Sequence, residues 1–455
     1  MGQARGYFWA VVRLAPVGLA LAVLQAFLPY DWDQGVVRAG LLLALGSLLA
    51  AAAPLGRRLA RFETPRALAV GLGLAVAFAG FLHVRQTVFS IRGDVRSEMG
   101  EIHVRAVPLL LKGVNPWSWG TVLDSGTYLG LSGFEVAHRC LGWSGAEAKG
   151  RLDAFWGSLE LEQMRALFPA TLDTPECAEA RELLAMSGYK YGPVMLAVYA
   201  PFVLAFGRPG IYLCHLAALL AIAAALWRLL GRGWRPTVAV GLALAVLFGQ
   251  SVILRNTLMD SDCDLIPTAL GCWGLVFALR DRPLPAGVLL GLSVGAKLFP
   301  GMLLLPLLLG RRWLRGGLGF GLAVLVGVGP AALLDGRGLF TNVVGFNLWR
   351  GPDSTSLAYF VPERFRVWLL AAAGVVAVSL WLGAWWQRSR QGLLVATTGT
   401  LLVFLASAKI FHNNYLVWLI PIYGATLGLL LTAGLVPGSG PVGSDALRAD
   451  VAAAE

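Results

Sequence analysis

Long apolar runs with few charges recur along the whole chain and constrain its fold more than any other feature. A helix needs about 20 such residues to cross about 30 Å of hydrocarbon. The clear candidates are residues 10–29, 36–54, 67–84, 211–230, 236–254, 264–279, 317–334, 366–386, 392–409 and 414–434. Weaker runs cover residues 191–207, 284–296 and 299–310. The pattern predicts an all-α integral membrane protein with about 12–13 membrane helices.

The composition agrees with a membrane protein. Of 455 residues, 57% are hydrophobic and only 14% are charged, which is too little polar surface to cover a soluble globule of this size. The formal net charge of +11 would suit a nucleic-acid partner. However, the arginines lie in short loops between apolar runs and form no basic patch interleaved with aromatic residues, so we expect no nucleic-acid binding.

The charges of the short loops predict how the helices are oriented. Net positive loops face the cytoplasm, and they cover residues 56–66, 231–235, 280–282, 311–315 and 387–391. Acidic residues outnumber basic ones in 85–189, and the two kinds balance in 335–365, so we expect both segments on the extracytoplasmic side. These charge-based assignments place both ends of segment 191–207 on the same side of the membrane. Either that segment dips into the membrane and returns, or one of the charge assignments is wrong.

These boundaries predict a single transmembrane domain over residues 1–435. In it, residues 85–189 form an extracytoplasmic loop with amphipathic helices that acts as a cap, and residues 335–365 form a second extracytoplasmic loop. Residues 436–455 are rich in Gly, Pro, Ser and Ala and are expected to be a disordered cytoplasmic tail. Cys140 and Cys177 both lie in the cap, where an oxidising compartment would allow a disulfide between them.

The cap opens with SIRGDVRSEMGEIHVRAVPLLLKGVNPW, residues 90–117, which is unusually rich in ionisable groups. Asp94 lies between two arginines that favour its charged form, and Glu98 and Glu101 follow at roughly one-turn intervals, so all three can line one helix face. A carboxylate at the membrane interface can meet both a lipid head group and a soluble substrate, which suits a general base. Each of the three is therefore a candidate base. The alternative is that Asp94 caps the helix that follows.

Lys297 lies in GAKLFPG, between the weak runs 284–296 and 299–310. These runs predict two short helices, or a re-entrant pair, that meet inside the membrane. An unpaired ammonium is costly there, so we expect an anionic partner, and a lipid phosphate would provide one. Snorkelling of the side chain to the surface is the alternative.

Further polar groups lie on the predicted extracytoplasmic side. They are Tyr189, Lys190 and Tyr191 before an apolar run, Arg255, Asp260, Asp262 and Asp264 between two runs, Arg350 in the second loop, and His412, Asn413 and Asn414 before the last run. Tyr and Lys at the membrane surface can donate to a phosphate, although an ordinary aromatic belt contains the same residues. The acidic cluster offers oxygen ligands for a divalent cation, although a plain polar turn would contain them too.

The order of these elements resembles the GT-C superfamily, whose members are multi-span glycosyltransferases that take sugars from polyprenyl-phosphate carriers. The cap, with its early carboxylates and its turn of Gly113, Asn115, Pro116 and Trp117, is similar to the first extracytoplasmic loop of prenyl-phosphate-mannose-type transferases. Other similar motifs are Tyr189-x-Tyr191-x-Pro193, the Arg/Asp cluster 255–264, the Gly-x-x-x-Gly-x-Lys-x-x-Pro pattern around Lys297, and the stretch 407–421 with its polar turn.

The resemblance implies an inverting hexosyltransferase of the mannosyltransferase type. It would be a multi-pass protein of the plasma (inner) membrane with its active site on the extracytoplasmic side. The enzyme would move a sugar from a polyprenyl-phosphate donor to a glycan, lipid or protein acceptor, in glycolipid or cell-envelope glycan biosynthesis. A lipid-linked-glycan flippase or other transporter, and a glycan ligase, are the alternatives.

The resemblance also implies roles for the candidate residues. Asp94, Glu98 or Glu101 would be the catalytic base. The donor phosphate would lie among Lys297, Arg255, His412, Tyr189, Lys190 and Tyr191. The remaining site residues would be Asp260, Asp262, Asn413, Asn414 and Arg350. No cofactor is implied with certainty, and a divalent cation stays open because metal dependence varies across the superfamily.

Overall fold

A computed structural model describes the helical body of the protein. The described residues are 77, 81, 83–92, 98–117, 188–230, 243–244, 247, 263–309, 312–349, 352, 356–387, 390–409 and 415–434. They form helices and turns, and none of them lies in a β-strand. The predicted runs 10–29 and 36–54, and most of 67–84 and 236–254, fall outside this part of the chain, as do the predicted tail 436–455 and the pair Cys140 and Cys177.

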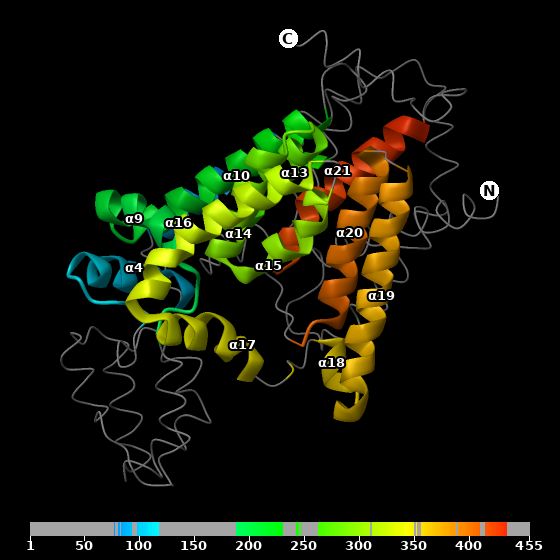
Figure 1. Ribbon diagram of the computed structural model, residues 1–455. Coiled ribbons are helices and arrows are strands. Elements are labelled where there is room, and N and C mark those ends of the chain that lie inside the picture. The colour runs from blue at the N-terminus through cyan, green and yellow to red at the C-terminus, as the bar shows by residue number, and fades with distance from the viewer. Residues whose placement is uncertain are drawn as a thin grey trace.

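The named helices follow one another along the chain in this order (Figure 1). They are α4 (Glu98–Leu111), α9 (Pro193–Phe206), α10 (Pro209–Leu230), α13 (Leu265–Leu279), α14 (Pro283–Ala296), α15 (Leu298–Gly301), η2 (Met302–Leu308), α16 (Trp313–Phe340), η3 (Thr341–Gly345), α17 (Phe346–Trp349), α18 (Leu357–Phe360), α19 (Glu363–Gln387), α20 (Arg390–Ser407) and α21 (Leu416–Gly434).

Three of these helical segments are long and apolar enough to cross a membrane. They are Pro209–Leu230, Trp313–Leu348 and Glu363–Trp386, and they coincide with three of the predicted runs. Large apolar side chains on α16 and α19 are exposed, among them Leu325, Leu333, Trp368 and Val375. Such surfaces suit hydrocarbon rather than water, so the prediction of an all-α integral membrane protein is confirmed.

Glycines bring α14 and α16 into close contact. A Cβ on Gly287 would lie 2.0 Å from the carbonyl oxygen of Gly316, and a Cβ on Gly319 would lie 2.3 Å from that of Leu284. Small residues allow membrane helices to approach with their backbones, which is how such helices pack when water does not drive them together. In Figure 1 the two helices run alongside each other.

The helices end on two opposite sides of the helical body, which we call the basic end and the lysine end after the side chains found there. At the basic end, the Arg280 side chain donates to the Arg228 carbonyl oxygen (3.0 Å), and Arg312 pairs with Asp281 (3.5 Å). The lysine end carries Lys190, Lys297 and Lys409. Because α10 and α13 end and α14 and α16 begin at the basic end, the start of α13 and the end of α14 meet at the lysine end.

The short helix α9 does not connect the two ends. It starts beside the end of α14, where the Gly192 amide donates to the Ala296 carbonyl oxygen (2.9 Å). It turns at Gly207, which has a positive φ of 63°, directly into the start of α10. Fourteen helical residues span about 21 Å, less than the hydrocarbon thickness. Segment 191–207 is therefore not a simple crossing.

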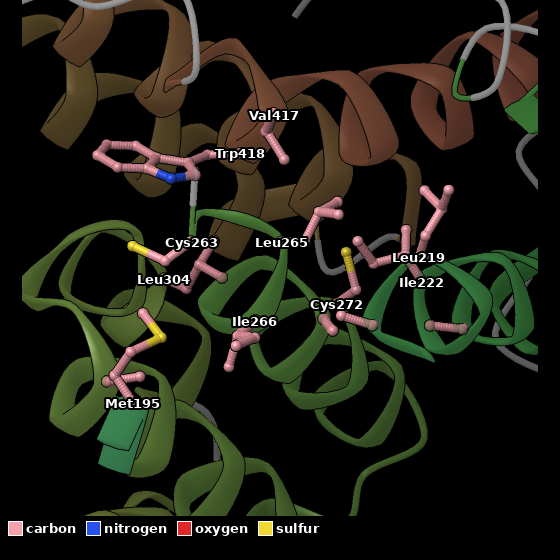
Figure 2. Packing of buried hydrophobic residues seen from close by; sticks show 14 of the residues in the cluster. Met195, Leu219, Ile222, Cys263, Leu265, Ile266, Cys272, Leu304, Val417 and Trp418 are labelled. Carbon is pink, nitrogen blue, oxygen red and sulfur yellow. The ribbon is translucent and has the colours of Figure 1, made fainter. Parts of the chain in front are cut away.

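Side chains from distant helices meet in one hydrophobic core. Figure 2 shows Leu219 of α10, Leu265 and Cys272 of α13, and Val417 and Trp418 of α21 within this cluster. All five are buried. This core holds the start of α13 against the start of α21, which positions the site described next.

Candidate functional site

The Gly-x-Asn-Pro-Trp turn ends α4 and anchors the cap to the helical body. Gly113 has a φ of +74°, which favours glycine. The Asn115 side chain then accepts a hydrogen bond from the Trp117 amide (3.0 Å) and so closes the turn. The Pro116 carbonyl oxygen accepts from the Tyr189 amide (2.9 Å), and the Trp117 indole donates to the Tyr191 carbonyl oxygen (2.9 Å). The turn thus fixes the path of residues 189–191.

Asn342 joins this turn to the segment that follows α16. Its side-chain amide donates to the carbonyl oxygens of Trp117 (3.1 Å) and Gly338 (3.0 Å). Asn342 is fully buried. The first loop and residues 335–365, which are far apart in sequence, are therefore held together by one amide.

Residues 189–191 direct three consecutive side chains to three different neighbours. The Tyr189 hydroxyl hydrogen-bonds to Nδ1 of His103 in α4 (2.9 Å). The Lys190 ammonium lies 3.9 Å from the centre of the Phe346 ring. The Tyr191 ring lies 5.6 Å from the Lys297 ammonium. This short segment therefore links α4, α17 and the end of α14.

His103 is the centre of a buried aromatic cluster. Its ring stacks on Tyr199 with centroids 4.1 Å apart, and the Tyr199 hydroxyl hydrogen-bonds in turn to His215 in α10. Burial lowers the pKa of His103 well below its usual value, and the neighbouring His215 and Lys297 act in the same direction. His103 is therefore neutral at physiological pH, as its apolar surroundings require. Burial also raises the pKa of Tyr189, which keeps that hydroxyl protonated.

Lys297 lies where α14 ends, in an extended conformation (φ −148°, ψ 130°) that separates α14 from α15. This agrees with the predicted meeting of two short helices. Its ammonium donates to Oδ1 of Asp264 at 2.7 Å. It also lies 4.9 Å from the centre of the Tyr415 ring and 5.4 Å from that of Trp418. A carboxylate and aromatic faces both stabilise a cation, so the expected anionic partner is present within the protein.

The short helix α17 lies between two lysines from distant segments. Lys190, before α9, contacts the Phe346 ring. Lys409, after α20, donates to the carbonyl oxygen of Leu348 (2.8 Å). Residues 189–191 also reach Lys297, as does Tyr415 just beyond Lys409. These contacts bring three lysines and several aromatic rings to the same end of the protein, an arrangement suited to an anion with an apolar attachment.

The structure describes some of the predicted site residues and not others. Tyr189, Lys190, Tyr191 and Lys297 lie together at the lysine end. Glu98 and Glu101 are the first and fourth residues of α4. The candidates outside the described residues are Asp94, Arg255, Asp260, Asp262, Arg350, His412, Asn413 and Asn414. Within the described part of the chain, no three His, Cys, Asp or Glu side chains could hold a metal ion together.

Several residues in this arrangement were not singled out by the sequence. His103 and Tyr199 join α4 to the helical body, and Trp418 donates to the same Asp264 oxygen that Lys297 contacts (2.6 Å). His215 carried a usable signal, because an ionisable residue within an apolar run deserves a functional hypothesis by default. The sequence carried no such signal for Trp418, because a Trp near the start of a membrane helix is common.

Comparison with known proteins identifies a family for part of the chain. Residues 189–408 match the model of glycosyltransferase family 87, a family of GT-C-type membrane glycosyltransferases. The match begins at Tyr189 and includes Asp264, Lys297 and Asn342. No curated protein and no solved structure matches the chain significantly. The resemblance found in the sequence is thus confirmed at the level of the superfamily, and the chain is a GT-C-type membrane glycosyltransferase.

Proposed function

We propose that this glycosyltransferase moves a hexose, of which mannose is our first candidate, from a polyprenyl-phosphate donor to a glycan, lipid or protein acceptor. The reaction takes place at the extracytoplasmic face of the plasma membrane. One observation carries the proposal: the Lys297 side chain is partly exposed, and its ammonium lies among aromatic rings at the end of the helices opposite the basic end. Because basic loops face the cytoplasm, the lysine end is extracytoplasmic in this proposal.

The donor phosphate binds beside Lys297 and Lys190. The sugar is transferred with inversion when an acceptor oxygen attacks the anomeric carbon from the face opposite the phosphate. The carbon–oxygen bond to the phosphate breaks, and its electron pair stays with the phosphate, which gains negative charge. Cationic groups that are already in position stabilise this charge as it develops. His412 and Arg255 are further candidates for this role, with Arg350, Asp260, Asp262, Asn413 and Asn414 as surrounding groups.

The residues before α9 contribute in different ways. Tyr191 provides a ring beside the Lys297 ammonium. Tyr189 is fully buried and its hydroxyl is bonded to His103, so we assign it to holding the segment in place. Lys190 is mostly buried against Phe346 and sets the position of α17 next to the phosphate.

The catalytic base is one of the early carboxylates of the cap. Asp94, Glu98 or Glu101 takes the proton from the acceptor hydroxyl as the new bond forms. Two of these residues begin α4, whose His103 contacts Tyr191 with ring centroids 5.2 Å apart. Because Tyr191 in turn neighbours Lys297, the position of α4 supports a base near the start of this helix.

Neutralising the base tests the proposal. We expect one variant among Asp94→Asn, Glu98→Gln and Glu101→Gln to lower transfer from polyprenyl-phosphate mannose by about 10²- to 10⁴-fold, the usual contribution of general-base catalysis. The purified enzyme would be assayed with membranes that supply acceptors, and mass spectrometry would size the transferred group. Binding of undecaprenyl phosphate should be unchanged in that variant.

Three outcomes would contradict the proposal. Undiminished transfer in all three variants would exclude these residues as the base. Movement of an intact lipid-linked glycan across a vesicle membrane, without transfer, would indicate a flippase. A transferred group larger than one sugar would indicate a glycan ligase.

A further inference from the structure

Asp264 occupies a helix N-cap but does not use its side chain as a cap. It directly precedes α13, where an Asp side chain commonly accepts a hydrogen bond from the first turn of the helix. Here the side chain makes no capping bond. Instead, its Oδ1 atom accepts from Lys297 (2.7 Å) and from the Trp418 indole (2.6 Å). The carboxylate is thus directed to two residues from other helices.

Exposure distinguishes the two members of the ion pair. The Asp264 side chain is completely buried, whereas 18% of the Lys297 side chain is exposed. A lysine ammonium has three N–H donors, and Asp264 takes one of them. The Lys297 side chain can therefore meet a ligand, whereas the Asp264 carboxylate cannot.

Hydrogen bonds also fix the backbone at Asp264 and at Lys297. The Asp264 carbonyl oxygen accepts from the Thr268 hydroxyl (2.6 Å) and from the Thr268 amide (3.2 Å). The Lys297 amide donates to the Ser293 carbonyl oxygen (3.0 Å), and the Ser293 hydroxyl donates to the Pro267 carbonyl oxygen of α13 (2.8 Å). The carboxylate thus holds the ammonium at a defined place between α13, α14 and α21.

We propose that Asp264 is a positioning residue for Lys297, which it holds at the site of the donor phosphate, and that Trp418 holds the carboxylate in turn. The inference rests on the proposed function, because it assumes that Lys297 contacts the phosphate. A buried ion pair contributes little net stability compared with neutral residues of similar size. Stability alone therefore does not account for the pair, whereas positioning of the partly exposed Lys297 side chain does.

A double-mutant cycle on undecaprenyl phosphate binding tests this inference. The variants are Asp264→Asn, Lys297→Met and the double variant, in detergent, with the dissociation constant measured by thermophoresis. We expect each single variant to weaken binding by about 10- to 100-fold, the range for losing a hydrogen bond with a charged partner. The double variant should bind no more weakly than Lys297→Met, because Asp264 then has nothing to position. Asp264→Glu should restore part of the affinity.

Two further variants keep the inference testable if Asp264→Asn folds poorly. Trp418→Phe removes the hydrogen bond to Asp264 and keeps an aromatic ring near the Lys297 ammonium. It should weaken binding several-fold, and it should have no effect in the Lys297→Met background. Asp281→Asn, which breaks the exposed pair with Arg312 at the basic end, should leave binding unchanged.

The outcomes separate the two proposals. If Lys297→Met binds undecaprenyl phosphate as well as the wild type does, the proposed phosphate contact is wrong, and the positioning role is wrong with it. If Lys297→Met weakens binding but Asp264→Asn and Trp418→Phe do not, only the positioning role is wrong. Losses that multiply in the double variant would give Asp264 a role independent of Lys297 and would also overturn the inference.

Discussion

His103 shows how a single buried side chain fixes the position of the cap. It is fully buried, hydrogen-bonds to Tyr189 and stacks on Tyr199. Among the described side chains, the titratable and charged groups around it are His215, Lys297, Tyr189, Tyr191 and Tyr199, and none of these is a carboxylate that could stabilise a protonated ring. The neutral form is therefore the one that the folded protein accommodates.

Stability should consequently fall in mild acid because of His103. Its pKa is lowered in the folded state, so below about pH 6.5 the unfolded chain binds a proton that the folded protein does not. This residue should cost up to about 1.4 kcal/mol per pH unit as the pH falls toward its folded pKa. Thermal unfolding in detergent between pH 7.5 and pH 5 should show a steeper loss for the wild type than for His103→Gln. Parallel pH profiles would contradict this prediction.

At the scale of helices and loops, a few contacts join the loops to the helical body. The cap contacts α9 through residues 189–191, and Asn342 ties its turn to η3. On the other side, Lys409 fixes α17 at Leu348. These are hydrogen bonds to backbone carbonyls, which hold a loop in place without requiring a regular helix–helix interface.

Removing the Asn342 amide should loosen the cap. Asn342→Ala leaves the buried Trp117 carbonyl oxygen without this donor, which should cost about 1–3 kcal/mol locally. Hydrogen exchange in residues 113–117 and 338–345 should become faster. Asn347→Ala is the matched control, because that exposed amide donates only within its own turn, to Val343. Equal exchange in the two variants would show that the Asn342 contact does not hold the turn.

At the scale of the whole molecule, most of the described helices form two groups, and α15 lies between them in Figure 1. One group contains α9, α10, α13, α14 and α16, and the other contains α19, α20 and α21. Trp418 crosses from the second group to Asp264 in the first. The exposed apolar faces of α16 and α19 suit a surrounding bilayer, and the contacts of Arg280 and Arg312 lie at the basic end of the first group.

The two ends should lie on opposite sides of the membrane. Lys112→Cys lies beside the cap turn and Arg312→Cys lies at the basic end, and both positions are exposed. With Cys140 and Cys177 replaced by Ser, the remaining cysteines are buried and should not react. An impermeant maleimide should label Lys112→Cys in intact cells and Arg312→Cys only after permeabilisation. The reverse pattern would place the lysine end in the cytoplasm and contradict the proposed site of reaction.

The sequence by itself determined the membrane class, the positions of most described helices and the superfamily. Apolar runs are local signals, because a helix in hydrocarbon satisfies its own backbone and needs no distant partner to be recognised. The break between α14 and α15 at Lys297 could be predicted for the same reason. An ammonium between two short apolar runs is costly in a membrane, whatever the rest of the fold. The match to glycosyltransferase family 87 confirmed the superfamily that the motifs had indicated.

Only the tertiary structure decided which residues meet. Asp264 looked like one of several acidic residues in a polar turn, yet it is the partner of Lys297, 33 positions away, and of Trp418, 154 positions away. The contact between Asn342 and Trp117 was equally hidden. Such pairs depend on how each helix is rotated and tilted against its neighbours, and packing across the core sets that rotation. No local pattern of residues encodes it.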